Sequence, residues 1–457
     1  MRRHATKNTD PRIFSNVKLD DESGRYVHEP GNVISASVLV AGTAVGAGIL
    51  ALPQALSPAG LVPAFVSITG SAVFSILTGL LVAEVCVNTL CELGSGSGVS
   101  IGSMAQRTLG AAGSNTVRAT YLLLHYTLLV AYTAKAGSTL SSLIDTDGSV
   151  ATSVLFTVII GGLCAAASPK QLDSANTALV LGVVGSFLFL VANVAQSLDM
   201  TSLSTALREE HFDLLLKSLP VVALSFVFQN VVPVICSSLE GDLGKIRTAI
   251  IAGVGVPWAM FSLWTLTILL ASQSADTGVG AAVAAGVGSS AAGTAAAGVG
   301  ASAAAASTAS TALDDPLAAL RTTANNALLI DSFSLLAVST SYIGFVLGLK
   351  EFLLELLGLT EAKGKALVYP LVLVPPLALA LSFPGLFYQA LEFAGAYGVL
   401  TLFGVIPVLM AWSERYGPQE VTLTRFQLVP GGRGVLIGLG VVSAGIICDQ
   451  ALSGLIE

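Results

Sequence analysis

Charged side chains are scarce in this sequence. Lys, Arg, Asp and Glu make up 11% of the 457 residues, whereas hydrophobic residues make up 53%. A soluble globular domain carries about 25% charged residues. Residues 30–83 contain no charged residue, and such a stretch can cross a bilayer twice because one helical crossing takes about 20 apolar residues. The composition therefore predicts an integral membrane protein whose constant partner is the lipid bilayer.

Other patterns are missing as well. The net charge is −7 and Lys and Arg form no cluster, which argues against a nucleic-acid partner. The five cysteines are odd in number and none lies in a C-x-x-C pair, so we expect neither a disulfide framework nor a metal site. The chain contains no H-E-x-x-H, G-x-x-x-x-G-K or G-x-S-x-G motif. These absences argue against an enzyme, a cofactor and direct ATP drive.

Uncharged stretches separated by turn residues predict eleven membrane spans. Backbone groups inside lipid must bond to one another, and apolar and polar residues do not alternate, so helices are expected rather than barrel strands. The predicted fold class is therefore an all-α integral membrane protein. The predicted spans are residues 33–57, 62–90, 118–144, 149–169, 174–198, 218–240, 247–272, 325–350, 366–384, 388–413 and 434–456.

The positions of Lys and Arg predict the orientation of these spans. With a cytoplasmic N-terminus, 17 of the 21 Lys and Arg residues fall in inner connections, 3 fall in outer connections, and Lys135 lies inside a span. Positively charged connections stay on the cytoplasmic side of a membrane. We therefore expect a cytoplasmic N-terminus. The same rule holds for a plasma membrane and for an organelle envelope, and of the two we expect the plasma membrane.

The predicted transporter domain covers residues 33–456. One segment before this domain and one segment inside it are expected to have no fixed helical structure. Residues 1–32 mix acidic and basic side chains without an apolar stretch, which indicates a disordered cytoplasmic tail rather than a targeting peptide. Residues 275–313 contain 17 Ala and 7 Gly among 39 residues. We expect residues 273–320 to form a flexible outer loop between the seventh and eighth spans, with a twelfth helix as the alternative.

Glycine interrupts the first predicted span. Gly42, Gly46 and Gly48 fall within seven residues near its middle, and Pro53 follows. Glycine weakens a helix interior. Close helix packing through Gly42-x-x-x-Gly46 is one interpretation, and a true break that exposes backbone groups to a ligand is the other. For a break, the candidate substrate-binding residues are Gly42, Thr43, Gly46, Ala47, Gly48 and Ile49.

The sixth predicted span contains a second interruption. Pro233 cannot donate to the helical ladder, and Gln229 and Asn230 place two amides inside a span. Spans one and six are corresponding members of two five-helix halves, as in transporters built from inverted repeats. Eleven spans then correspond to a 5+5 inverted repeat plus one extra helix. The candidate substrate-binding residues in this span are Ser225, Phe226, Phe228 and Gln229.

Two broken helices can together bind a zwitterion. Amides that begin the second half of span one, at Ala47, Gly48 and Ile49, suit a carboxylate with the help of the helix dipole. Carbonyls that end the first half-helices, near Ala41 and Phe226, can accept from an ammonium group. The sequence therefore predicts an α-amino acid as the substrate of a secondary transporter.

Several motifs along residues 33–415 resemble, in type and in order, the motifs of one known family. The string from Gly42 to Pro53, G-T-A-V-G-A-G-I-L-A-L-P, resembles the opening motif of the tryptophan/tyrosine permeases, within the amino acid, polyamine and organocation superfamily. The further matches are Glu84 with Asn88, Ala131-Tyr132, Gly137-Ser138, Ser225-Phe226, Val232-Pro233, Ala337–Gly344 and Leu347-Gly348-Leu349.

This resemblance implies eleven helices, the leucine-transporter fold and proton-driven symport of tryptophan or tyrosine. The chain departs from the family in its Ala/Gly-rich segment and at Phe228-Gln229-Asn230, which lies in the implied substrate pocket. Sodium-coupled or broader neutral amino acid transport is one alternative. A sensor that binds an amino acid without moving it is another.

A polar stripe in the third span supplies further candidates. Tyr121, His125, Tyr132 and Lys135 recur at helical spacings, and a lipid-facing Lys135 would cost at least a few kcal/mol, so the stripe is expected to face the bundle interior. Tyr132 and Phe226 are the first candidates to stack on an aromatic substrate. The candidate ion-coupling residues are Glu84, His125, Lys135, Ser339, Thr340 and Ser341.

Each of these coupling candidates has a structural alternative. His125 can serve packing, Lys135 an ion pair, and Glu84 an interhelical hydrogen bond. The hydroxyls in the eighth span resemble those that hold sodium in related carriers, but membrane Ser and Thr often bond to their own helix backbone. Residues 174–198 contain no basic residue, so the lysine that replaces sodium in some proton-driven relatives is absent from the fifth span.

Overall fold

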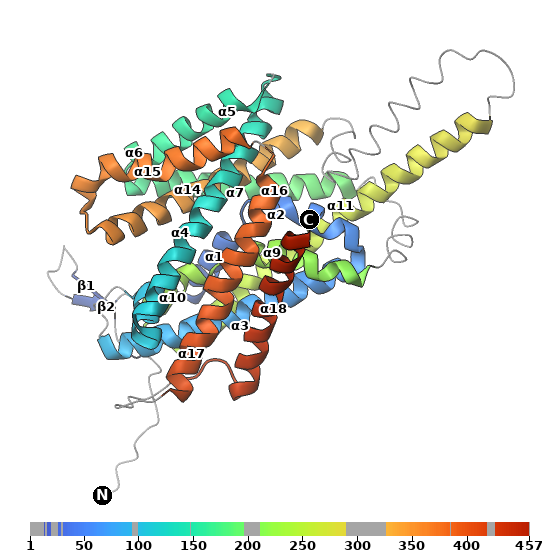
Figure 1. Cartoon of the computed structure of the whole chain (residues 1–457). Coiled ribbons are helices and arrows are strands. Elements are labelled where there is room, and N and C mark those ends of the chain that lie inside the picture. Colours follow the sequence, from blue (N-terminus) through green and yellow to red (C-terminus); the bar gives the residue numbers. More distant parts are fainter. Residues whose placement is uncertain are drawn as a thin grey trace, which may run out of the picture.

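The protein is almost entirely helical (Figure 1). The computed structural model describes residues 13, 16–19, 26–28, 31–93, 99–146, 148–195, 211–288, 326–383, 385–417 and 426–456. Within these ranges the only strands form a two-stranded antiparallel hairpin near the N-terminus. The predicted all-α class is therefore confirmed.

The first half of the chain contains both of the predicted interrupted spans. Its strands and helices are β1 (Val17–Leu19), β2 (Tyr26–His28), α1 (Val33–Ala44), α2 (Gly48–Leu56), η1 (Ser57–Ala59), α3 (Leu61–Leu93), α4 (Ile101–Leu143), α5 (Ser149–Phe156), η2 (Thr157–Gly161), α6 (Gly162–Ala166), α7 (Pro169–Ala195), η3 (Phe212–Leu214), α9 (Leu215–Ser225), η4 (Gln229–Val231) and α10 (Val232–Ser238).

The second half contains longer helices and one segment of π-helix. Its elements are α11 (Leu243–Gly288), α14 (Asn326–Leu357), α15 (Glu361–Ser382), α16 (Phe387–Phe393), the π-helix η5 (Ala394–Val405), α17 (Ile406–Tyr416) and α18 (Gly432–Ile456). Each of the eleven predicted spans overlaps a helix or a consecutive run of helices from these two sets.

Most of these helices have the length and composition of membrane spans. Among the described residues nine qualify, and up to ten if the bent pair α1 and α2 counts as one span. Helix α4 is outside this set because its apolar stretch is interrupted by polar side chains, including His125 and Lys135. The protein is therefore a multi-pass membrane protein, and α4 is its most polar long helix.

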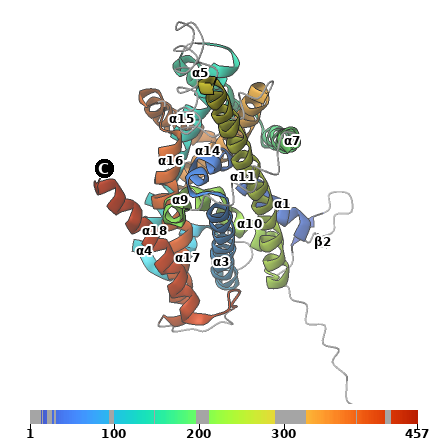
Figure 2. The ribbon, with the colours of Figure 1, turned by 90° about the vertical axis from the view of Figure 1, so that its right-hand side faces the viewer.

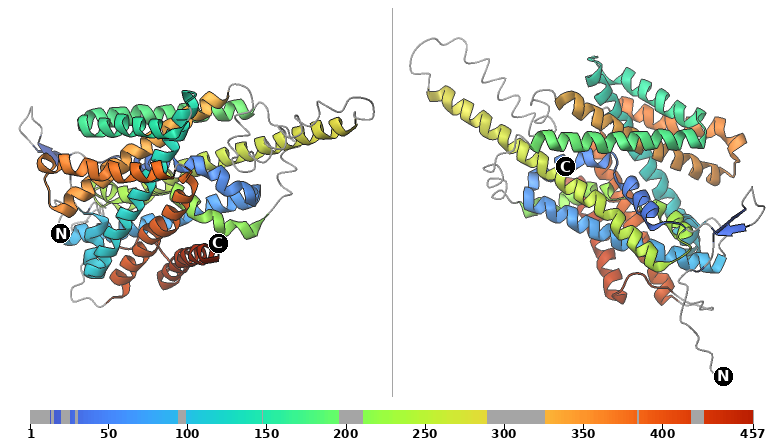
Figure 3. Two further views of the ribbon diagram at one scale, coloured as in Figure 1. Left: turned by 45° about the horizontal axis from the view of Figure 1, so that its top comes forward. Right: turned by 180° about the vertical axis from the view of Figure 1, so that it is seen from behind.

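The helices form two groups that meet around the interrupted spans. In the first helix group α1, α2, α3, α9, α10 and α11 pack on one another, and in the second helix group α4, α5, α7, α14 and α15 do so. Figures 2 and 3 show α5, α7, α14 and α15 together on one side of the molecule. Segment η5 and helix α17 contact α4 and α3, so they join the two groups.

Helix α4 is longer than the predicted span of residues 118–144. It begins at Ile101, where Ser100 and Ser103 form a capping box, and it bends at Gly110. Gly110 has a φ of 71°, a left-handed conformation that glycine adopts without a steric penalty. The bend separates a short segment at the start of α4 from the part that contains the predicted span, and the sequence did not predict this segment.

The N-terminal segment differs from the disordered tail predicted for residues 1–32. Its described residues include the hairpin of β1 and β2, which lies beside the turn between α10 and α11. Glu240 in that turn accepts from the backbone N–H of Asn16 and contacts His28 Nε2, both at 2.6 Å. These contacts fix part of the segment, and the rest of residues 1–32 lies outside the described residues.

Part of the predicted Ala/Gly-rich loop is helical. Residues 273–288 continue α11, which extends beyond the other helices (Figure 1). Alanine has the highest helix propensity of all residues, so an Ala-rich sequence can prolong a helix that has already formed. The remainder of the predicted loop, residues 289–320, lies outside the described residues.

Candidate functional site

The first predicted span is broken, as its glycines indicated. Helix α1 ends at Ala44 and α2 begins at Gly48, and their axes differ by 58°. The connecting residues 45–47, which we name the first break, are buried. An added Cβ at Gly42 would meet nothing within 4 Å, so Gly42 makes no close helix contact and the packing interpretation is wrong at this position.

The sixth predicted span is broken as well. Helix α9 ends at Ser225 and η4 begins at Gln229, which leaves residues 226–228 as the second break. The two breaks lie side by side. A Cβ added to Gly48 would come within 2.7 Å of Ser225 Oγ and 3.0 Å of its Cα, so only glycine allows this approach without displacement.

A hydroxyl from the second helix group reaches the first break. The backbone N–H of Ala47 donates to Ser341 Oγ of α14 at 2.8 Å. Gly46 lies against the same Ser341 side chain, and the Tyr132 side chain of α4 lies close to it. The structure therefore brings together the predicted residues Gly46, Ala47, Tyr132 and Ser341.

A side-chain network braces the second break. Gln229 Oε1 accepts from the Phe228 N–H at 3.0 Å, and Gln229 Nε2 donates to Ser75 Oγ and Thr78 Oγ1 of α3, both at 3.1 Å. Ser75 Oγ in turn donates to the Phe226 carbonyl at 2.7 Å. These bonds satisfy polar groups that the interrupted helix leaves open. The oxygen and the nitrogen of the Gln229 amide therefore both bond to protein groups.

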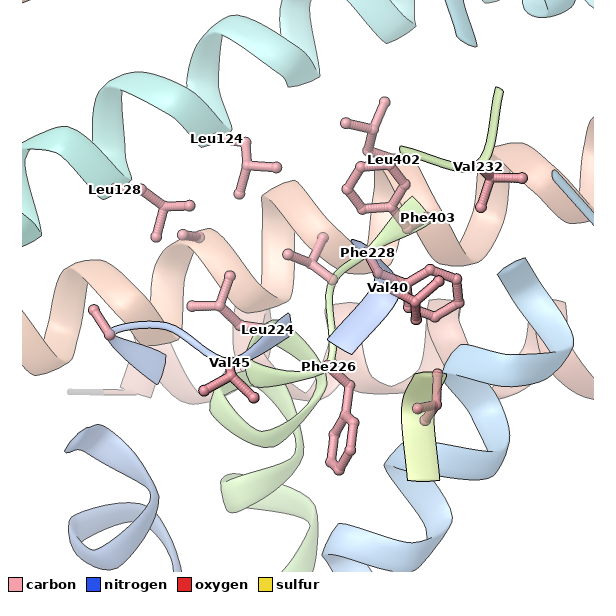
Figure 4. Close-up of a cluster of buried hydrophobic side chains, with 14 of the residues drawn as sticks. Val40, Val45, Leu124, Leu128, Leu224, Phe226, Phe228, Val232, Leu402 and Phe403 are labelled. Carbon is pink, nitrogen blue, oxygen red and sulfur yellow. The ribbon is translucent and has the colours of Figure 1, made fainter. Parts of the chain in front are cut away.

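Aromatic and aliphatic side chains surround both breaks (Figure 4). Phe226 and Phe228 are each 0% exposed, and the Phe226 ring packs edge-to-face on Phe261 of α11 with a centroid distance of 5.0 Å. Figure 4 shows Val45 of the first break beside Leu224, which precedes the second break. The backbone of both breaks is therefore enclosed in an apolar environment, where electrostatic interactions are stronger than in water.

Two of the predicted substrate-binding residues lie away from this junction. Gly42 is exposed, and the Thr43 hydroxyl donates to the Leu39 carbonyl of its own helix at 2.7 Å. The backbone carbonyl of Ile49 accepts from Trp264 Nε1 at 3.0 Å, so this group already has a protein partner. Sequence position near the glycines did not reveal which face of α1 each residue occupies.

The other hydroxyls of the eighth span bond to their own helix. Ser339 Oγ donates to the Leu335 carbonyl at 2.6 Å, and Thr340 Oγ1 donates to the Ala337 carbonyl at 2.9 Å. Only Ser341 of this trio bonds to the first break. Within the described part of the chain, no three His, Cys, Asp or Glu side chains are grouped as metal ligands.

His125 has the surroundings of a packing residue. Its ring stacks on Tyr121 with a centroid distance of 3.8 Å, and its Nδ1 lies 2.9 Å from the Tyr121 carbonyl. Phe345 of α14 covers the ring from another side at 4.9 Å. The side chain is 5% exposed, so it joins α4 to α14 within the second helix group.

Glu84 forms a buried ion pair that connects α3 to α17. Its carboxylate oxygens accept from Arg415 Nε at 2.6 Å and Arg415 Nη2 at 2.7 Å, and they also accept from the backbone N–H of Leu428 at 2.7 Å. Asn88, one turn further, donates to Glu414 Oε2 at 2.9 Å. Glu84 therefore makes the interhelical contact of its structural alternative, and its partners lie in the C-terminal part of the sequence.

Lys135 lies one turn beyond Tyr132 on α4. Its ammonium group is 5.4 Å from the centroid of the Phe387 ring, where the quadrupole of the ring attracts a cation. Phe387 begins α16, so the contact joins the second helix group to the tenth span. Of the charged candidates, Lys135 is the nearest in sequence to Tyr132.

The sequence analysis missed the residues of α3 that brace the second break. Ser67, Ser71, Ser75 and Thr78 recur every three or four residues and are all buried. Ser67 Oγ also lies 3.1 Å from Ser218 Oγ of α9. The signal was present as a polar stripe at helical spacing inside an apolar span, which indicates an interhelical contact.

A sequence profile of the tryptophan/tyrosine permease family matches residues 30–277 and 295–449. These two ranges include both breaks, α3, α4 and α14. The match therefore covers all the residues that meet at the junction.

Individual relatives match over most of their own length. A tyrosine-specific transport system 2 of Haemophilus influenzae is 26% identical over 83% of this chain and 87% of its own. A tryptophan-specific transport protein of the same organism is 23% identical over 84% of this chain and 88% of its own. A tryptophan-specific transport protein of Pseudomonas aeruginosa is 25% identical over 84% and 87% respectively.

Proposed function

The chain belongs to the tryptophan/tyrosine permease family, and on this premise we propose that it transports tryptophan or tyrosine by symport with protons. It is a transport protein rather than an enzyme. Relatives named for tyrosine and for tryptophan both match over most of the chain, which supports an aromatic substrate. The observation that carries the proposal is the junction of two broken helices beside Tyr132 and Ser341.

The substrate backbone is proposed to bind at the first break. The Ala47 N–H points out of the helical ladder and already donates to an oxygen, Ser341 Oγ at 2.8 Å. A substrate carboxylate is a stronger acceptor than a hydroxyl and gains from the N-terminal dipole of α2. Binding would then exchange the Ser341 contact for a charged one, with Gly46 and Gly48 allowing close approach.

The aromatic side chain is proposed to pack near the second break. Phe226 is part of the second break and Tyr132 lies beside the first, and edge-to-face or offset stacking of aromatic rings contributes about 0.5–1.5 kcal/mol per pair. Because Phe226 and Phe228 are 0% exposed, entry of a substrate ring requires these side chains or their helices to move. This requirement suits a carrier that encloses its substrate during transport.

Alternating access follows from the division into two helix groups. The first break belongs to the first helix group, whereas Ser341 and Tyr132 belong to the second. A relative movement of the two groups would therefore change the contacts on one side of the substrate. The hydrogen bond between Ala47 and Ser341 is the contact most directly affected.

Uptake into proteoliposomes tests this proposal. Labelled tryptophan would be supplied with and without an inward proton gradient, with unlabelled tyrosine and leucine as competitors. We expect concentrative uptake that tyrosine reduces more strongly than leucine and that a protonophore abolishes. Liposomes without protein are the control.

Each alternative has its own outcome in the same experiment. Uptake that follows a sodium gradient and ignores pH would replace the proton as the coupling ion. Equal competition by leucine would indicate a broader neutral amino acid transporter. Saturable binding without uptake would indicate an amino acid sensor and would contradict the transport proposal.

A further inference from the structure

A second region of the molecule combines a cavity with charged side chains. The cavity has a volume of about 300 Å³ and lies where α6, α7, α14 and α15 meet. Its residues come from the end of α6, the start of α7, the last turns of α14 and the start of α15. It therefore lies at one end of the spans, which the distribution of Lys and Arg predicts to be cytoplasmic.

The cavity is separate from the junction of broken helices. Ser341 faces the first break from α14, whereas Gly344, Leu347 and Glu351 of the same helix line the cavity. At 3.6 residues per turn, these three residues point roughly 60–120° away from the direction of Ser341. A ligand in the cavity would therefore contact a different face of α14 from the proposed substrate.

Charges of both signs line the cavity. Lys350, Lys365 and Glu351 all contribute to its wall. Lys350 is only 9% exposed, whereas Lys365 and Glu351 are exposed at its edge. Two ammonium groups and one carboxylate in one small space suit a ligand that carries an anionic and a cationic group.

One residue of the cavity wall, Asn176, has a side-chain oxygen without a hydrogen-bond partner in the described part of the chain. Asn176 Oδ1 is buried and has no hydrogen-bond partner among the described residues. A buried amide oxygen without a partner costs about 1–3 kcal/mol. A ligand with an N–H donor would satisfy this oxygen, whereas a simple anion would not.

The helices that flank the cavity face the surrounding lipid. In the apolar windows of α7 and α15, only 17% and 33% of the residues are buried inside the protein. Ile343, Leu347 and Leu172 form an apolar wall of the cavity. A molecule whose polar end occupies the cavity could thus extend hydrocarbon chains along these helices. Basic pockets between membrane helices on the cytoplasmic side bind phospholipid head groups.

We propose that this cavity binds the head group of a phospholipid with a primary ammonium group, of the phosphatidylethanolamine class. Lys350 and Lys365 contact the phosphate, and Asn176 Oδ1 and Glu351 accept from the ammonium group. Phosphatidylcholine has the same phosphate but a quaternary ammonium without N–H donors, so it leaves Asn176 unsatisfied. This site is independent of the proposed transport function.

Native mass spectrometry of the delipidated full chain in detergent tests the proposal. Phosphatidylethanolamine, phosphatidylglycerol and phosphatidylcholine with identical acyl chains would be added at equal concentrations. We expect phosphatidylethanolamine to be retained most, at least threefold more than phosphatidylcholine. Equal retention of the three lipids would overturn the proposed site.

A glycine in the cavity wall offers a variant that fills the space without disturbing the fold. A Cβ added to Gly344 meets nothing within 4 Å, and the same holds for Gly255 on the outer face of α11. We expect Gly344→Leu to abolish the preference for phosphatidylethanolamine and Gly255→Leu to preserve it. Asn176→Ala is expected to reduce the preference about threefold, as loss of one hydrogen bond predicts. An unchanged preference in Gly344→Leu would contradict the location.

Competition distinguishes other sources of the same chemistry. Inorganic phosphate, tyrosine and tryptophan would each be added at millimolar concentration to the lipid-bound protein. We expect none of them to displace phosphatidylethanolamine. Displacement by phosphate would assign the cavity to a free anion, and displacement by an amino acid would make it a second substrate site, and either result would overturn the lipid proposal.

Discussion

The two broken spans differ in how their open backbone groups are satisfied. At the second break, Gln229 bonds to Phe228 and to Ser75 and Thr78 of α3, so all its partners lie within the first helix group. At the first break, the Ala47 N–H donates to Ser341 of the second helix group. The second break is braced internally, whereas the first depends on a contact between the groups.

This difference assigns different tasks to the two breaks. A network within one group persists when the groups move relative to each other, so the second break can keep its shape throughout transport. A single hydrogen bond between the groups can be exchanged for a bond to a substrate at little net cost. The first break is therefore the expected place of ligand exchange, and four substitutions test this division.

The largest effect is expected at the brace. Gln229→Leu keeps a similar volume but leaves the Phe228 N–H without its acceptor and Ser75 and Thr78 without a donor. Because unsatisfied buried groups cost about 1–3 kcal/mol each, we expect a loss of about 3 kcal/mol in stability. The measurement is thermal unfolding in detergent.

The neighbouring amide provides the control for this substitution. Asn230 is exposed, so Asn230→Leu should leave the unfolding midpoint nearly unchanged. An unfolding midpoint of Gln229→Leu equal to that of the parent would show that the network does not brace the second break.

The contact between the breaks is expected to show the next largest effect. Gly48→Ala places a Cβ 3.0 Å from Ser225 Cα, which forces α2 and α9 apart. Overpacking of this kind costs about 1–3 kcal/mol, so substrate affinity should fall about 30-fold if the separation of the breaks sets it. Equilibrium binding of labelled tryptophan measures the change.

Gly42→Ala is the matched control within the same span. An added Cβ there meets nothing within 4 Å, and alanine favours a helix over glycine by about 0.5–1 kcal/mol. Its affinity should equal that of the parent. A similar loss in both variants would mean that helix flexibility, and not the contact with Ser225, controls binding.

The positions of the breaks could be predicted because local chemistry determines them. Gly46, Gly48 and Pro233 weaken a helix wherever it lies in the fold, so residues 45–47 and 226–228 were found from neighbouring residues alone. The orientation of side chains at the break was less predictable. Thr43 bonds to the Leu39 carbonyl of its own helix, and Gln229 faces α3.

Contacts between distant segments could not be predicted from the sequence. Glu84 and Arg415 are separated by 331 residues, and nothing in either segment identifies the other as its partner until the fold brings them together. Ser75 and Thr78 were visible as part of a polar stripe in α3, but nothing local identified Gln229 as the partner. Helix ends were also uncertain, since α11 continues to Gly288 through an Ala-rich sequence that resembles a loop.

A smaller effect is expected at the hydroxyl that contacts the first break. Ser341→Ala removes the acceptor that the substrate carboxylate is proposed to replace at the Ala47 N–H. Because this bond stabilises only the free protein and one neutral hydrogen bond contributes about 1 kcal/mol, substrate affinity should rise about fivefold. Ser339→Ala is the control, since Ser339 bonds only to its own helix at Leu335. Equal Kd values for Ser341→Ala and Ser339→Ala would show that the first break is not part of the substrate-binding site.

The smallest change in affinity is expected at Lys135, where the informative result is the pH profile. Lys135→Met removes a charge that lies 5.4 Å from the Phe387 ring centroid and one turn beyond Tyr132. Affinity for tryptophan should therefore change by about twofold, which corresponds to the lower value of a cation–π contact, about 0.5 kcal/mol. In a proton symporter, uptake rises as the external pH falls, and we expect this dependence to flatten in Lys135→Met and to persist in Lys135→Arg. Uptake measured from pH 5.5 to 8 decides between a coupling role and a structural role for Lys135. An unchanged profile in Lys135→Met would leave the ammonium group a structural contact between α4 and α16. The proton would then have to be sensed elsewhere than beside the first break.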